Sequence, residues 1–211
     1  MNIKIRRRNF TSARTRFVLR WSRNVFLGAG ILLVSYVGLT LLDAKLYQAR
    51  EFRHFQQEIK DSKPAVSGEP GLRQTAFHPP SGGALGEIEV TRLGVKAMIL
   101  EGTDEGILRR AVGHIPGTAL PGTSGNVGIA GHRDTFFRAL RNVRQGDEIT
   151  VWTLNGSDRY RVDSIEVVGP EDIEVLDPSS DNILTLVTCY PFYFVGPAPR
   201  RFIVRAERVS F

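Results

Sequence analysis

The chain has 211 residues, of which 42% are hydrophobic and 24% charged, so it can fold one domain with a core and carry one further segment. Its formal net charge is +6, but eight of its 28 Lys and Arg residues precede residue 24, where no acidic residue occurs, and the other 20 face 22 acidic residues. Because the excess positive charge is confined to a short arm beside an apolar stretch, we exclude nucleic-acid binding as the function.

Residues 24–42 form an uncharged, largely apolar stretch that would span about 28 Å as a helix, close to the thickness of the bilayer hydrocarbon core. A cleaved signal peptide is the alternative, but the stretch is long for one and is followed by Asp43-Ala44-Lys45, not by a small-x-small cleavage site. We therefore predict a single-pass anchor in the cytoplasmic membrane. The basic arm 1–23 then lies in the cytoplasm, and everything after Leu42 lies outside.

The segment after the anchor is predicted to hold the folded part away from the membrane. Residues 43–61 place Leu46, Phe52, Phe55 and Ile59 at roughly helical spacing, which favours a helical stalk. Residues 62–86 are rich in Pro, Gly and Ser, a composition typical of an extended linker. The folded domain is therefore expected to span 87–211.

This domain is predicted to be mainly β. Short β-type runs alternate with turn signals, and Asn155-Gly156 between two of them indicates a hairpin. Residues 134–141 look like a short helix with Asp134 as its N-cap. We expect a closed seven- to eight-stranded β-barrel with one or two short helices. The runs cover residues 87–93, 96–100, 126–131, 148–154, 160–168, 183–190 and 202–209.

Cys189 is the only cysteine, and its thiol can be interpreted in two ways. In an exported domain an unpaired cysteine is an intermolecular link or a reactive thiol, whereas a buried, inert thiol is the bland alternative. Cys189 ends an apolar run and precedes Pro191, so it lies where a strand opens into a loop. The sequence has no phosphate-binding glycine loop and no cluster of metal ligands, so we expect neither a cofactor nor a metal.

Two other residues are candidate partners for the thiol. His132 also ends a β-type run, whereas His114 lies in a Pro/Gly-rich segment, so we favour His132. Arg201 opens the last run, and a hairpin through the loop after Cys189 would bring its guanidinium back beside the thiol. A solvated surface arginine is the alternative, and the neighbouring Arg200 leaves the choice between the two open.

Together these motifs resemble the sortase family of cysteine transpeptidases. The resemblance rests on Thr-Leu-Val-Thr-Cys at 185–189, Ala-Gly-His at 130–132, an arginine opening the final apolar run, and a membrane anchor ahead of the barrel. It extends from about residue 87 to 209. The sequence Cys-Tyr-Pro-Phe at 189–192 is more similar to the class D branch than to class A.

The resemblance implies that Cys189 attacks the Thr carbonyl of a sorting motif of the Leu-Pro-x-Thr-Gly kind near the C-terminus of a substrate protein. His132 would protonate the leaving amine, Arg201 would steady the oxyanion, and an amine acceptor at the cell surface would release the acyl group. Beside them we expect Thr188, Ala130 and Phe192 to contact substrate, although Phe192 can equally belong to the core. Two rival functions stay open: a purely hydrolytic cysteine peptidase, and a noncatalytic barrel that binds extended peptides.

Overall fold

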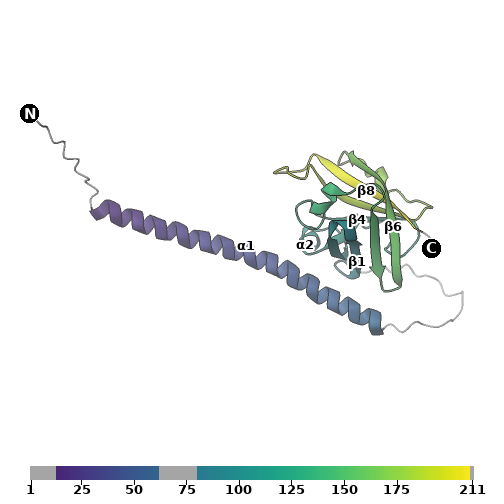
Figure 1. Cartoon of the computed structure of the whole chain (residues 1–211), viewed down its shortest axis with the longest axis horizontal. Helices are drawn as coiled ribbons and strands as arrows, with labels where there is room; N and C mark the ends of the chain where they lie inside the picture. Colours follow the sequence, from purple (N-terminus) through teal and green to yellow (C-terminus); the bar gives the residue numbers. More distant parts are fainter. Residues whose placement is uncertain (1–12, 62–79, 210–211) are drawn as a thin grey trace, which may run out of the picture. The chain divides into compact units, whose positions relative to one another are not determined.

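The computed structural model describes residues 13–61 and 80–209. The first range is one helix, α1 (Ala13–Asp61), which Figure 1 draws without a break. Within it, Phe17–Leu39 is long and apolar enough to cross a membrane, with a mean hydropathy of 1.4. Residues 1–12 of the predicted arm and 62–79 of the predicted linker lie outside the described residues.

The second range forms a closed barrel of eight strands, which confirms the expected fold class. Its strands are joined in the order β1-β2-β3-β4-β7-β8-β6-β5, and the pairs β2–β3 and β4–β7 are parallel. The strands are β1 (Ala84–Val90), β2 (Val95–Glu101), β3 (Val112–His114), β4 (Asn126–Ala130), β5 (Glu148–Thr153), β6 (Gly156–Val168), β7 (Ile183–Tyr190) and β8 (Arg200–Arg208). Short helices lie between them: η1 (Thr91–Leu93), α2 (Glu105–Leu108), η2 (Arg138–Asn142) and η3 (Ile173–Leu176).

The barrel interior is filled by alternate residues of the strands, as the period of two requires. Its core cluster takes Val127 and Ile129 from β4, Leu184 and Leu186 from β7, and Val204 from β8 among others. The side chains between these positions therefore face outward. A second, smaller apolar cluster joins the outer face of β2 to α2 through Met98, Leu100, Ile107 and Ala111.

Two local predictions need correction. Strand β3 was not predicted, because its three residues Val112–His114 lie between Gly- and Pro-rich segments and gain strand character only by pairing with β2 and β4. The helix expected at 134–141 begins later, at Arg138, and Asp134 is not its N-cap, since Phe137 occupies that position. The hairpin at Asn155-Gly156 is confirmed by the antiparallel pairing of Thr153 with Gly156.

An ion pair fastens the connection between β1 and β2 to the start of β5. The Arg92 guanidinium donates two hydrogen bonds to the carboxylate of Asp147 and one to the carbonyl of Asn142, at 2.8 Å. The backbone N–H of Arg144 donates to the same carboxylate, at 2.8 Å. The hydrogen bonds from Arg92, helped by that N–H, hold the pKa of the Asp147 carboxyl below its ordinary value.

This lowered pKa makes barrel stability depend on pH. A carboxyl whose folded pKa is depressed contributes stability above its ordinary pKa of about 4 and loses it as the pH falls through the folded pKa. We expect Asp147→Asn to lower the urea midpoint at pH 7 and to reduce the fall in midpoint between pH 5 and pH 3. Urea unfolding of the full chain in detergent at these pH values measures both effects. An unchanged pH profile in the variant would show that another carboxyl dominates acid unfolding.

Candidate active site

Strands β7 and β8 bring the thiol and one guanidinium opposite each other. The antiparallel register pairs Cys189 with Arg201 and Tyr190 with Arg200. Because side chains of directly paired residues lie on the same face of a sheet, Arg201 shares the face of Cys189, whereas Arg200 shares the face of Tyr190. The register thus separates two arginines that the sequence left equivalent.

The parallel pairing of β4 with β7 directs the segment that carries His132 toward the same end of the barrel as Cys189. Their parallel register pairs Ala130 with Val187, and the ladder continues through the N–H of Gly131, which donates to the carbonyl of Val187 at 3.1 Å. β4 ends at Ala130, so His132 lies two residues beyond this ladder, and Cys189 lies two residues after Val187 on β7. Residues far apart in the chain thus meet at the same end of the barrel because both strands run in the same direction.

Strand alternation places the side chains of Cys189 and Arg201 on the outer surface of the barrel. Leu184 and Leu186 of β7 face the core, so Cys189 faces outward, and the same alternation turns Arg201 away from Val204. A Cβ built on Gly131 would point at the ring of Phe137, so His132 takes the opposite, outward direction. The thiol is half-buried, which differs from the inert core thiol that was the alternative.

A single hydroxyl joins the residues that precede Cys189 and His132. Thr188 is 3% exposed, and its Oγ1 donates to the carbonyl of Gly131 at 2.7 Å. The Gly131 position is tight, because a Cβ there would lie 2.6 Å from the Phe137 ring. Thr188 therefore links the ends of β4 and β7, and its expected contact with substrate stays a prediction.

The Arg201 guanidinium is directed toward the end of the loop that follows Cys189. Its Nη1 donates to the carbonyls of Ala198, at 3.2 Å, and Arg200, at 3.1 Å. These contacts occupy at most two of the five N–H donors of an arginine, so donors remain for a ligand. Arg201 is also half-buried, which strengthens its interaction with a negative charge relative to a fully solvated cation.

Phe192 belongs to an aromatic cluster at the same end of the barrel. Its ring lies 5.1 Å from that of Phe202 and 6.1 Å from that of Tyr190, in edge-to-face geometry. It also packs against the barrel core while staying half-buried. Ala130, the last residue of β4, does not belong to this cluster. It faces outward, one position before the Gly131–His132 pair.

Two loops cover the outer face of β4 below the candidate site. A Cβ at Gly128 would come within 3.0 Å of Leu176 in η3 and of Thr118, so both side chains lie over this strand. A cavity of about 160 Å³ opens beside them, lined by residues that include Ala119, Asn126 and Leu176. The cavity therefore lies at the start of β4, beside Asn126.

The loop that carries η3 is held by a buried amide. Asn126 donates to the carbonyls of Val175, at 3.0 Å, and Asp177, at 3.1 Å, and its oxygen accepts the hydroxyl of Thr185 at 2.7 Å. Sequence reasoning missed this role, although an asparagine at the start of an apolar strand was a usable signal, because a buried amide needs partners.

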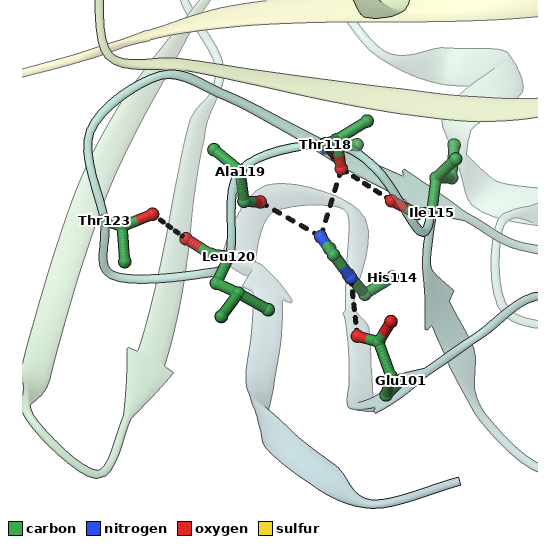
Figure 2. A network of polar contacts seen from close by, with 8 residues as sticks. Glu101, His114, Ile115, Thr118, Ala119, Leu120 and Thr123 are labelled. Carbon is green, nitrogen blue, oxygen red and sulfur yellow. Dashed lines mark hydrogen bonds and ion pairs between the residues drawn. The ribbon is translucent and has the colours of Figure 1, made fainter. Parts of the chain in front are cut away.

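His114 has a structural place, away from the thiol. It ends β3, is 2% exposed, and lies between Glu101 and the loop before β4, as Figure 2 shows. Its Nδ1 lies 2.6 Å from the Glu101 carboxylate, and its Nε2 lies 3.0 Å from the carbonyl of Ala119 and from Oγ1 of Thr118. The expectation that His114 has no strand-end position was wrong, but its ring is fully committed to this network.

A thiol, an imidazole and a guanidinium at one surface edge form a recognisable chemical set. Cationic neighbours favour a thiolate over a thiol, and the thiolate is the effective nucleophile. An imidazole can transfer the proton that an amine leaving group needs, and a guanidinium can stabilise a developing oxyanion. The arrangement is therefore suited to acyl transfer through a thioester.

Comparisons with known proteins agree with this chemistry. A model of the sortase domain family matches residues 88–209, more than half of the chain. Sortase D of Bacillus subtilis (strain 168) is 29% identical over 189 residues, which cover 87% of this chain and 96% of that protein.

Solved structures give the same answer for the fold. The structure of a Clostridium perfringens sortase D5 transpeptidase has a TM-score of 0.64 at 28% identity, covering 78% of this chain and 99% of that chain. Sortase A from Corynebacterium diphtheriae has a TM-score of 0.57 at 28% identity, with 80% and 85% covered.

The Thr188 hydroxyl is expected to be worth a measurable part of barrel stability. Thr188→Val keeps the shape of the side chain but leaves the carbonyl of Gly131 without this donor, which should cost about 1–3 kcal/mol. Urea unfolding of the full chain in detergent measures the loss. Thr150→Val on β5 is the matched control and should change stability by less than about 0.5 kcal/mol. Equal effects of the two substitutions would refute the role of this hydrogen bond.

Proposed function

The chain belongs to the sortase family of cysteine transpeptidases, and from this premise we propose that it cleaves a sorting signal of the Leu-Pro-x-Thr-Gly kind and joins the cleaved protein to a surface amine. The observation that supports the proposal most directly is the register that sets Arg201 opposite Cys189, together with the parallel β4–β7 ladder, which ends two residues before His132 and two before Cys189. An extended substrate can reach this face without entering the filled interior.

In the proposed first step, the Cys189 thiolate attacks the carbonyl carbon of the signal's threonine. An S–C bond forms, the carbonyl electrons move to oxygen, and collapse of the tetrahedral intermediate breaks the C–N bond to the following residue. His132, as imidazolium, gives its proton to the departing amine. The product of this step is a thioester on Cys189.

In the second step, an amine acceptor attacks the thioester carbonyl. Neutral His132 now takes the proton from the attacking nitrogen, a new amide bond forms, and Cys189 leaves as thiolate. Arg201 stabilises the oxyanion of both tetrahedral intermediates with the donors that its contacts to Ala198 and Arg200 do not use. Two half-reactions thus use the same three side chains.

Other residues take supporting roles in this proposal. Ala130 offers a small outward-facing surface on β4 next to His132, where a bulky side chain would obstruct an extended peptide. Thr188 acts on the reaction indirectly, by fixing the strand ends that carry Cys189 and His132. Phe192 forms the aromatic end of the barrel that borders the substrate surface.

We further propose that the barrel, at 87–211, is tethered outside the cytoplasmic membrane. The apolar span in α1 is compatible with an anchor, and the basic residues that precede it favour a cytoplasmic N-terminus. Residues 1–23 would then form the cytoplasmic arm, 24–42 the anchor, and 43–86 the stalk and linker. Substrate proteins would meet the enzyme at the cell surface.

Cys189→Ala should abolish the reaction without unfolding the barrel, because it removes only the SH group of a half-buried side chain. We expect a loss of at least about 10³-fold in turnover of a fluorogenic Leu-Pro-x-Thr-Gly peptide, followed with and without added glycine peptide as amine. Wild-type enzyme should yield the amide product when amine is present. Release of free acid alone under both conditions would favour a hydrolytic peptidase, and retained turnover in the variant would remove Cys189 from the mechanism.

The two neighbouring arginines should differ sharply in their effect. Arg201→Ala should lower kcat/KM by about 10²-fold or more, because it removes an oxyanion donor on the face of Cys189. Arg200→Ala, on the opposite face of β8, should stay within about threefold. Steady-state kinetics with the same peptide compare the pair. The reverse order would assign the oxyanion role to Arg200.

A further inference from the structure

Arg133, the residue directly after His132, holds the loop between β7 and β8. We define the β7–β8 loop as residues 191–199. The Arg133 guanidinium donates from Nη1 to the carbonyl of Pro191, at 3.0 Å, and from Nη2 to those of Phe194, at 2.8 Å, and Gly196, at 3.0 Å. One side chain thus connects both halves of this loop to the end of β4.

The geometry of these contacts is specific to arginine. A planar guanidinium presents several N–H donors in a fixed fork, so one group can bind three carbonyls at once, which a single lysine ammonium on a flexible stem does less well. Arg133 is half-buried, and its guanidinium carbon Cζ lies 5.9 Å from the centre of the Phe194 ring. A solvated surface arginine would not make this set of contacts.

Phe192 anchors the start of the loop against the barrel core, but the tip of the loop has few other contacts. Tyr193 is 77% exposed, Phe194 45% and Val195 95%, so the tip buries little apolar surface. A second arginine of the segment after His132 supports it, since the guanidinium carbon of Arg141 lies 5.5 Å from the centre of the Tyr193 ring. A loop with an exposed tip and few buried contacts opens locally when its polar attachments are removed.

Both ends of this loop lead into the reaction site. Pro191, bound by Arg133, lies two residues after Cys189, and Ala198 near the other end accepts a hydrogen bond from Arg201. Arg133 itself is covalently joined to His132. The loop therefore contacts Arg201 directly and, through Arg133, is attached to the segment that carries His132.

We propose that Arg133 is a positioning residue that fixes the β7–β8 loop and, through Ala198, the guanidinium of Arg201. This inference rests on the proposed function, in which Arg201 stabilises the oxyanion. Without Arg133 the loop opens, the Ala198 carbonyl leaves its place, and Arg201 samples orientations that do not face the thioester carbon. Arg133 takes no part in bond making and does not touch the substrate.

The loop attachment can be tested without measuring activity. Chymotrypsin cuts after the aromatic residues at 192–194, and cutting requires local opening of the loop. In the full chain in detergent, Arg133→Gln should increase the rate of cutting within 191–199, mapped by mass spectrometry, by about tenfold or more. Arg138→Gln, which changes an exposed arginine of the same segment, should cut at the wild-type rate. Equal rates in the two variants would overturn the proposal.

Arg133→Lys tests whether a folding defect explains the faster cutting, since it keeps the positive charge but loses the planar guanidinium. It should melt within a few degrees of wild type and be cut at a rate between those of wild type and Arg133→Gln. Cutting as slow as in wild type would show that the three carbonyl contacts are not needed.

The route through Arg201 is tested by a double-mutant cycle in peptide transfer. Arg133→Gln should lower kcat/KM by about tenfold in the wild-type background and by less than about threefold in an Arg201→Lys background, because the second change removes the group that Arg133 positions. A tenfold loss in both backgrounds, or no loss in either despite faster cutting, would overturn the proposal. If the wild-type enzyme transfers nothing, the proposed function fails, while the cutting rates still decide whether Arg133 holds the loop.

Discussion

The parallel pairing of β4 with β7 is the constraint on which the site depends. Gly131 and Thr188 are 57 residues apart in the chain, yet a 2.7 Å hydrogen bond joins them. Because the two strands point the same way, the residues that follow this bond, His132 and Cys189, both lie at the same end of the β4–β7 pair. The antiparallel partner β8 then supplies Arg201 directly opposite the thiol.

Much of this arrangement was accessible from the sequence, and the parts that were not have a common physical cause. A long strand such as β7 can be predicted from its apolar content, and Cys189 lies near its end, as the sequence predicted. The strand predicted to end at His132 ends earlier, at Ala130. Strand β3 and the late start of η2 at Arg138 depend on pairing and packing with distant segments, which local composition does not encode. The choice between Arg200 and Arg201 needed the register, since a shift of one residue exchanges the two faces.

The supporting residues were the hardest to predict. Arg133, Asn126 and Thr188 all bind main-chain carbonyls, and a carbonyl is present at every position of the chain. Sequence therefore gives no sign of which carbonyl will be presented, because that depends on how a loop or strand end is folded. The pair formed by Glu101 and His114 is equally hard to predict, because its two residues come from different strands.

Because the site lies on the outer face of the barrel, the residues that stabilise the fold are separate from those proposed to select the substrate. Here the barrel interior is filled mainly by Val, Ile and Leu, whereas the proposed function assigns substrate recognition to loops such as the one that carries η3 and the one that follows Cys189. Exchanging residues in those loops removes little apolar surface from the interior, so thermodynamic robustness and substrate preference can vary independently. A barrel of this kind can change the substrates it accepts during evolution while its core stays the same.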